Sequence, residues 1–267
     1  MRLAIAAVAL ALAASPADYV VSHQQPDGGF AEPGATSDPA LTAWAVLGLV
    51  AAGRDPGAPA ADYLTGQPAS GATEIALRVL ALRALGQDAS PEVARLEALR
   101  RRDGRVGPLV NSTIWSVLAL RAAGRPVATS IRYLVRAQHR SGGWAWYPRG
   151  APDSNDTAAA VQALRAGGLE ARSRPIRRAL SYLRRLQHAD GGFSLVRGRA
   201  SDAQSTAWAI QAFVAARREP GGASFRYLAR LRRPDGSYRY SKRYATTPVW
   251  VTSQVLPALA RRPFPLR

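Results

Sequence analysis

One short motif recurs six times in this chain of 267 residues. Its best copies read QQPDGGF, QHRSGGW and QHADGGF, and they begin at Gln24, Gln138 and Gln187. Three further copies, QPASGAT, RRRDGRV and RRPDGSY, keep fewer of these residues and begin at positions 67, 100 and 232. Neighbouring copies lie 33 to 49 residues apart, which suits one supersecondary unit per copy. The chain is therefore predicted to be a protein of six repeats.

The motif has the composition of a turn that joins two helices. Its glycines allow the positive φ that ends a helix, and its Asp can accept a hydrogen bond from the nearby backbone. The aromatic residue at its end is predicted to anchor the turn between helices. The leading Gln is predicted to reach free backbone groups at a neighbouring helix end. We interpret the motif as part of the scaffold.

Two kinds of helical pattern alternate around these turns. Residues 174–187 carry apolar side chains at helical spacing and arginines elsewhere, as in a half-exposed helix. The segments that follow the turns are apolar nearly all round, so they must be covered on several sides. They include residues 40–53, 112–124, 156–168 and 205–216. This alternation predicts six helical hairpins.

Six hairpins can close into a ring, with the buried helices as an inner barrel and the half-exposed helices outside. An open solenoid is the alternative, and it needs end caps with polar outer faces. The last buried segment, residues 249–260, has no such face. We therefore predict an all-α fold, a single α/α toroid (α6/α6 barrel) of six helical hairpins.

The repeated Q-x-x-D-G-G-F/W turn between helices resembles the prenyltransferase/squalene-oxidase repeat of terpenoid cyclases and protein prenyltransferase β subunits. The resemblance covers nearly all of the chain after residue 18 and is strongest at Gln24, Gln138 and Gln187. It implies an α/α toroid whose central cavity binds isoprenoid or other bulky apolar ligands. Similar toroids occur in cobalamin-binding transport proteins and complement thioester domains, so the fold alone does not determine a function.

The first 17 residues have features of a secretory signal peptide. Arg2 precedes an apolar run over residues 3–14, and Ser15-Pro16-Ala17 resembles a processing site. This interpretation makes residues 1–17 a signal peptide, residues 18–267 the toroid domain, and the protein secreted or attached to the cell surface. The alternative is a short buried helix that completes the first hairpin.

Composition limits the partners and the chemistry. The 36 Lys and Arg against 18 Asp and Glu favour anionic surroundings, such as a membrane or wall surface. The arginines are spread over the outer helices without a nucleic-acid motif, so we expect no specific nucleic-acid partner. The absence of cysteine excludes disulfides, thiolate zinc sites and a cysteine nucleophile. We predict no cofactor and no metal, and the sequence does not specify an oligomeric state.

Polar and aromatic residues recur where the buried helices begin. A threonine register is assigned to Thr42, Thr73, Thr113, Thr157, Thr206 and Thr247. Neighbouring polar residues can cap the helices, at about 1 kcal/mol each. Because inner helices of a ring run parallel, the same residues can also surround one mouth and contact a ligand. The candidates for the ligand cavity are Asp38, Trp44, Asn111, Trp115, Trp144, Trp146, Asp156, Asp202, Gln204, Trp208 and Trp250.

Two long loops could shape that mouth. Both contain aromatic residues beside cations, namely Trp144, Trp146, Tyr147 and Arg149, and Tyr238, Tyr240, Lys242, Arg243 and Tyr244. Such side chains can cover an apolar ligand and hold an anionic head group. They can equally pack against the rim for stability, and the sequence leaves both roles open.

The catalytic signatures of the family are incomplete. Class II terpenoid cyclases carry an Asp-x-Asp-Asp stretch whose central acid protonates an alkene or epoxide. The nearest match, Asp153-Ser154-Asn155-Asp156, lacks two adjacent carboxylates. The zinc site of protein prenyltransferases needs a cysteine, which is absent. The three histidines, His23, His139 and His188, lie at the turns and form no ligand cluster.

The sequence alone thus favours a secreted or surface-associated toroid that binds a hydrophobic, isoprenoid or other bulky ligand without transforming it. The alternative is a divergent terpenoid cyclase or prenyltransferase-like enzyme acting on an isoprenoid through Asp153 or Asp156. A protein-interaction ring without a small ligand is the third possibility. The identity of the ligand does not follow from the sequence.

Overall fold

The computed structural model describes residues 14–266, and over that range it contains twelve α-helices and no strand. The even-numbered helices are α2 (Pro39–Ala51), α4 (Ala72–Ala84), α6 (Val110–Ala122), α8 (Ser154–Ala166), α10 (Ala203–Ala215) and α12 (Pro248–Leu259). The odd-numbered helices are α1 (Pro16–Val21), α3 (Ala58–Gly66), α5 (Ser90–Ala98), α7 (Ala128–Arg136), α9 (Arg174–Arg184) and α11 (Gly222–Leu231).

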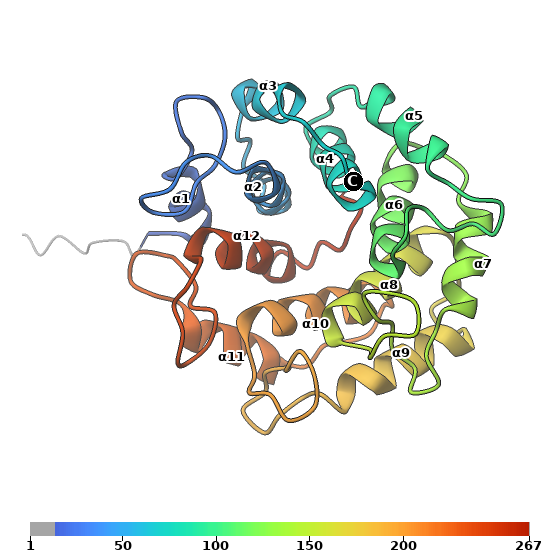
Figure 1. Cartoon of the computed structure of the whole chain (residues 1–267). Helices are drawn as coiled ribbons and strands as arrows, with labels where there is room; N and C mark the ends of the chain where they lie inside the picture. Colours follow the sequence, from blue (N-terminus) through green and yellow to red (C-terminus); the bar gives the residue numbers. More distant parts are fainter. Residues whose placement is uncertain (1–13, 267) are drawn as a thin grey trace, which may run out of the picture.

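The even-numbered helices form a closed inner ring, and the odd-numbered helices surround it (Figure 1). Each inner helix packs against the next, and α12 packs back against α2. The inner helices are buried almost all round, whereas an outer helix such as α9 buries only one side, with Ile176, Ala179 and Leu183. The predicted α/α toroid of six hairpins is confirmed.

Polar contacts between the first and last repeats also join the ends of the ring. The carboxylate of Glu32 accepts the backbone N–H groups of Val249 and Trp250 at 3.0 and 2.8 Å. Arg232 donates to the carbonyl oxygen of Ala14 at 2.8 Å. These pairs are 217 and 218 positions apart in the sequence, so the six repeats form a ring and not an open solenoid.

The recurrent turn joins successive repeats, as the fourth copy illustrates. Gly142 has φ +100°, and a Cβ added there would lie only 2.5 Å from the carbonyl oxygen of Arg178 on the next outer helix. Gln138 donates from Nε2 to the carbonyl oxygens of Gly142 and Pro175, at 2.8 and 2.9 Å. A side chain at position 142 would therefore force two repeats apart. The predicted scaffold role of the glycine and the leading Gln is confirmed.

A threonine of the inner helix holds the aromatic end of the turn. The backbone N–H of Trp144 donates to Thr157 Oγ1 at 3.0 Å, and that of Phe193 donates to Thr206 Oγ1 at 2.9 Å. Thr42 and Thr252 do the same in the first and sixth repeats, and Thr113 accepts the N–H of Val106 in the third, where a valine stands in the aromatic position.

The threonine register needs two corrections. In the sixth repeat Thr252 makes the turn contact, whereas the predicted Thr247 precedes α12 with a left-handed backbone. In the second repeat α4 begins almost directly after its turn, and Thr73 donates instead to Asn111 Oδ1 at 3.2 Å. The segments that lead into α4 and α12 are short or irregular, so Thr73 and Thr247 do not occupy the position that the threonines of the other repeats share.

The first hairpin begins before residue 18. Ser15 caps α1, which starts at Pro16, and Ala17 is buried against the core. Residues 1–13 lie outside the described part of the chain, so the signal peptide and its processing remain predictions. Within residues 14–266 no helix has the length and apolar character needed to cross a bilayer.

Candidate functional site

A cavity of about 530 Å³ lies inside the ring, among the N-terminal turns of the inner helices. Each inner helix gives the wall two residues that are one helical turn apart. The layer nearer the helix starts consists of Ala40, Thr73, Asn111, Asn155, Gln204 and Trp250. The deeper layer consists of Trp44, Leu77, Trp115, Ala159, Trp208 and Gln254. Glu74, Trp146, Asp153, Asp156 and Leu195 complete the lining.

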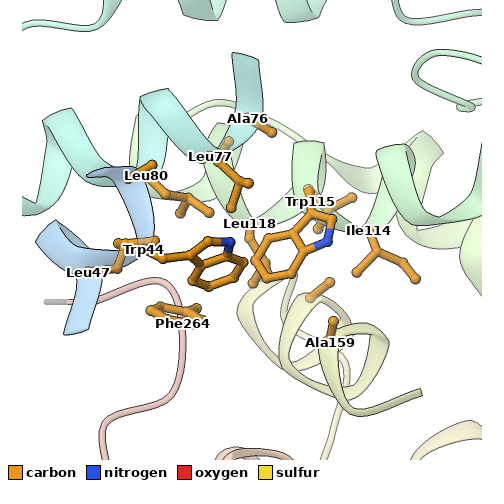
Figure 2. Packing of buried hydrophobic residues seen from close by; sticks show 14 of the residues in the cluster. Trp44, Leu47, Ala76, Leu77, Leu80, Ile114, Trp115, Leu118, Ala159 and Phe264 are labelled. Carbon is orange, nitrogen blue, oxygen red and sulfur yellow. The ribbon is translucent and has the colours of Figure 1, made fainter. Parts of the chain in front are cut away.

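Three tryptophans of the deeper layer, Trp44, Trp115 and Trp208, form what we call the tryptophan floor. Their ring centroids are 5.3 to 5.5 Å apart, and all three pairs meet edge to face. Figure 2 shows the rings of Trp44 and Trp115 side by side. Each such pair adds about 0.5–1.5 kcal/mol beyond its buried area, which fixes the ring planes. The cavity therefore ends on rigid aromatic surfaces that suit an apolar chain.

Asp156 brings a buried carboxyl group to this apolar cavity. It is the third residue of α8, its side chain lines the cavity, and the residue is only 3% exposed. Burial raises the pKa of Asp156 well above its ordinary value, and the negative charge of the neighbouring Asp153 raises it further. Both effects favour the protonated, uncharged form of the Asp156 carboxyl.

The neighbours of Asp156 hold this carboxyl in place. Asn111 on α6 donates from Nδ2 to Asp156 Oδ1 at 2.6 Å, and Thr73 on α4 donates to Asn111 Oδ1 at 3.2 Å. Asp153 is the N-cap of α8 and accepts the backbone N–H of Asp156 at 2.8 Å. Burial also raises the pKa of Asp153, although hydrogen bonds from the helix start oppose this effect. Of the two carboxyls, Asp156 has the stronger reasons to be protonated, because it is more deeply buried and lies beside the charge of Asp153.

A second polar group lies across the cavity. Gln254 Oε1 accepts hydrogen bonds from Gln204 Nε2 at 2.7 Å and from Trp208 Nε1 at 3.0 Å. These contacts leave the face of the Trp208 indole free to line the cavity. Glu74 completes the polar rim, and backbone hydrogen bonds from Ser70 and Gly71 lower its pKa. The shift favours ionised Glu74 and is opposite in direction to that of Asp156.

Comparison with protein-family models shows to which family this chain belongs. The model of the squalene-hopene cyclase C-terminal domain matches residues 116–251, which is more than half of the chain. The chain belongs to this family. The model of the prenyltransferase α/α toroid domain matches residues 4–89. The resemblance of the repeated turn to this superfamily is thereby confirmed.

Solved structures share the toroid fold at low sequence identity. The type II terpene cyclase MstE from Scytonema has a TM-score of 0.69 and 17% identity, over 92% of this chain and 95% of its own. The ent-copalyl diphosphate synthase from Streptomyces platensis has a TM-score of 0.62 and 24% identity, over 84% of this chain and 50% of its own.

A glycosidase in complex with glucose has a TM-score of 0.68 and 12% identity, over 92% of this chain and 95% of its own. Proteins with different chemistry thus share this fold, and the toroid alone does not select a reaction. The comparison with curated proteins found no match.

The toroid brings most of the candidate residues to one place. Asn111, Asp156, Gln204 and the tryptophans at positions 44, 115, 146, 208 and 250 all line the cavity, as does Asp153. Among the aromatic and cationic residues of the two long loops, only Trp146 reaches it. Trp146 is 49% exposed, so it lies at the rim.

Three other candidates lie outside the cavity. Trp144 is fully buried, and its indole N–H donates to the carbonyl oxygen of Leu134 at 2.8 Å. Asp202 caps α10 and accepts the backbone N–H of Ser205 at 2.7 Å. Asp38 caps α2 and lines a smaller pocket of about 190 Å³ beside the cavity. The sequence also allowed a structural role for these three residues, as helix caps or as packing. Their side chains have that role in the structure.

Sequence reasoning missed several wall residues, among them Leu77, Ala159 and Gln254. These occupy the positions that tryptophan holds in other repeats, so composition gave no signal for them. Aligning the repeats on Thr252 instead of Thr247 would have placed Gln254 in the tryptophan register and Trp250 one turn above it. Because Thr247 was assigned to the register in place of Thr252, Gln254 was not recognised as a wall residue that contacts Gln204 and Trp208.

Proposed function

We propose that this toroid is an isoprenoid cyclase that starts its reaction by protonating the bound chain from Asp156. The observation that carries the proposal is a buried carboxyl, with a raised pKa, in the wall of a cavity that five tryptophans line. This choice reverses the preference drawn from sequence, which placed a non-catalytic binding protein first. The family membership supports the choice, because it links the chain to cyclases of isoprenoids.

The ligand class follows from the cavity wall. Its volume of about 530 Å³ falls within the range of about 300–1,000 Å³ typical of small-molecule sites, and indole rings make up much of its surface. An extended, unsaturated apolar chain matches these surfaces better than a polar ligand. A variant of MstE in complex with geranylgeranyl dihydroxybenzoate, its substrate, supports this ligand class for the fold.

The proposed chemistry begins with a single proton transfer. The O–H of Asp156 adds its proton to one carbon of a terminal alkene, or to an epoxide oxygen, and leaves a carboxylate. The resulting carbocation is attacked by the next double bond, which closes a ring, and loss of a proton from carbon ends the sequence. The Asp153–Asp156 pair then regains one proton from solvent. The overall reaction is an isomerisation that consumes no oxidant or reductant.

The raised pKa of Asp156 has two consequences for this step. It favours the protonated acid that the step needs, but it also makes the acid weak. The site must therefore gain its rate by stabilising the cation. Aromatic faces attract cations by about 0.5–2 kcal/mol each, and several tryptophans surround the place where the charge develops. Asn111 stabilises the carboxylate left behind, because its amide donates to Asp156 Oδ1.

The site departs from the Asp-x-Asp-Asp pattern at one position. The central position of that pattern is the amide Asn155, and the acid stands one residue later at Asp156. Both side chains line the cavity. The remaining carboxyl, Asp156 at the last position of the pattern, lies next to Asn111 on α6. The substrate is therefore expected to bind with its reacting end near the α6–α8 junction.

The test is product formation from defined isoprenoids. Purified protein is incubated with geranylgeranyl diphosphate, squalene and geranylgeranyl dihydroxybenzoate, and extracts are analysed by gas or liquid chromatography with mass spectrometry. A cyclic isomer of one of these compounds, formed by the wild type and lost in Asp156→Asn, supports the proposal. A compound that binds but is recovered unchanged would support the non-catalytic binding protein instead.

A further inference from the structure

The segment after α12 crosses the base of the ring. Arg262 Nη1 donates to the carbonyl oxygen of Val50 at the end of α2, at 3.0 Å. Two residues later, the backbone N–H of Phe264 donates to Gln162 Oε1 on α8 at 2.7 Å. In a ring of six inner helices, α2 and α8 face each other, and Figure 1 shows the end of the chain running into the centre. Residues 262–266 thus form a strap across the C-terminal ends of the inner helices.

Phe264 is the residue of this strap that meets the tryptophan floor. Its ring centroid lies 6.2 Å from Trp44, 6.4 Å from Trp115 and 5.9 Å from Trp208. The residue is only 3% exposed, and Figure 2 shows its ring next to Trp44, on the side of Leu47. One phenyl ring therefore packs against all three indoles of the floor from below.

The space beneath the floor is incompletely filled. A second hollow of about 380 Å³ is lined by Phe264, Gln162 and Arg165, together with other residues near the ends of α8 and α10. Gln162 and Gln211 lie one turn beyond Ala159 and Trp208 on their helices. Within the described part of the chain, Nε2 of Gln162 and both amide atoms of Gln211 have no hydrogen-bond partner. The three indoles and Phe264, packed among buried leucines such as Leu47 and Leu118, therefore close the bottom of the cavity.

From this arrangement we infer that Phe264 determines how long a ligand the toroid accepts. The ring holds the tryptophan floor closed, so an apolar chain in the cavity stops at the level of Trp44, Trp115 and Trp208. Without this ring the indoles lose a common partner, and the cavity can extend along the axis toward the second hollow. This inference rests on the proposed ligand class and does not depend on Asp156 being an acid.

The experiment measures binding and not turnover. Farnesol, geranylgeraniol and squalene, which increase in length, are titrated into the full chain and their affinities measured by native mass spectrometry. In Phe264→Ala, the ratio of the affinity for the longest ligand to that for the shortest should rise about tenfold or more, as expected when an apolar pocket changes size. Phe264→Leu keeps more of the packing and should give a smaller shift in the same direction.

The matched control is Phe30→Ala, which removes an equally buried phenyl ring from the first turn, away from both the cavity and the second hollow. Its ligand ratio should equal that of the wild type. An unchanged ratio in both Phe264 variants, with melting curves that show folded protein, overturns the inference. The same shift in Phe30→Ala overturns it too.

The outcomes also separate this inference from the proposed function. If the wild type binds none of the three compounds, the ligand class is wrong and both proposals fall. If length selection shifts in Phe264→Ala but no ligand is ever cyclised, the inference stands and the proposed reaction falls. If products form but their length range is the same in Phe264→Ala, only the inference falls.

Discussion

Helices α8 and α10 start with the same cap and differ in chemistry. Asp153 and Asp202 occupy the two N-cap positions and accept a backbone N–H at 2.8 and 2.7 Å. The third residue of α10 is Ser205, whose hydroxyl donates to Asp202 at 2.8 Å. The third residue of α8 is Asp156, a second carboxyl that Asn111 holds at the cavity wall.

This difference between the two helix starts affects the pKa values of their carboxyl groups. Burial raises the pKa of Asp202 to about 6, against hydrogen bonds from Ser205 that lower it. Burial and the charge of the adjacent Asp153 raise the pKa of Asp156 well above its ordinary value. The two helix starts thus differ by one extra carboxyl that lines the cavity, and this difference is what the proposed function depends on.

The largest expected effect comes from making α8 resemble α10. Asp156→Ser removes the second carboxyl and leaves a hydroxyl that can donate to Asp153, as Ser205 does to Asp202. General acid catalysis contributes about 10²–10⁴-fold to a rate, so product formation should fall at least about a hundredfold. Turnover of the substrate found with the wild type is the measurement. Comparable activity in Asp156→Ser would show that the two helix starts do not differ in function.

The next effect tests the α10 cap through stability. The pKa of Asp202 is raised in the folded state to about 6, from about 3.9 in the unfolded chain, so its contribution is fully present below about pH 3.9 and lost as pH rises through about 6. Asn caps a helix as well as Asp and stays neutral. Asp202→Asn should therefore gain up to about 3 kcal/mol over the wild type above pH 6.

Urea unfolding of wild type and Asp202→Asn at about pH 4 and about pH 8 measures this gain. The difference between the two proteins should be larger at the higher pH. Cyclisation by the variant should be unchanged, since Asp202 does not line the cavity. A variant that loses activity while remaining folded would move Asp202 into the site.

A smaller loss of stability should be equal for matching substitutions on α8 and α10. Thr157 and Thr206 each hold the backbone of a turn aromatic, at 3.0 and 2.9 Å. Thr157→Val and Thr206→Val leave a buried N–H without its acceptor, which costs about 1–3 kcal/mol. Chemical denaturation should give similar losses for both. A much larger loss for Thr157 would show that the turn near Asp156 is strained in a way that α10 is not.

The smallest effect concerns the hydroxyl of Ser205. Its hydrogen bond to Asp202 favours the carboxylate, so Ser205→Ala should raise the pKa of Asp202 somewhat above its value of about 6. A carbon-13 NMR titration of labelled aspartate can follow this shift. A fall in the pKa would mean that burial is relieved by the substitution and would weaken the comparison.

Much of the fold could be predicted from sequence because each repeat carries the same physical instructions. Glycines such as Gly142 and fully apolar helices specify turns and an inner ring without knowledge of the ligand. The site was only partly accessible, because the wall position of each helix is set by register. Trp115 and Asn111 are visible as unusual residues at a helix start, whereas Ala159 is an ordinary alanine that lines the cavity through its position alone.

Two features needed coordinates. The environment of Asp156 depends on Asn111, which is 45 residues away in the sequence and belongs to another repeat. Phe264 follows the last repeat, where no periodicity guides an interpretation. Contacts between repeats, and contacts of residues outside the repeat pattern, do not follow from any local sequence pattern.

The central claim, that Asp156 holds a proton at neutral pH inside the tryptophan-lined cavity, can be measured without a substrate. Infrared difference spectroscopy between wild type and Asp156→Asn at neutral pH isolates the signal of this one carboxyl. A protonated carboxyl band is expected in the wild type, lost in Asp156→Asn and retained in Asp202→Asn. A carboxylate band from Asp156 at neutral pH, without the protonated form, would contradict it.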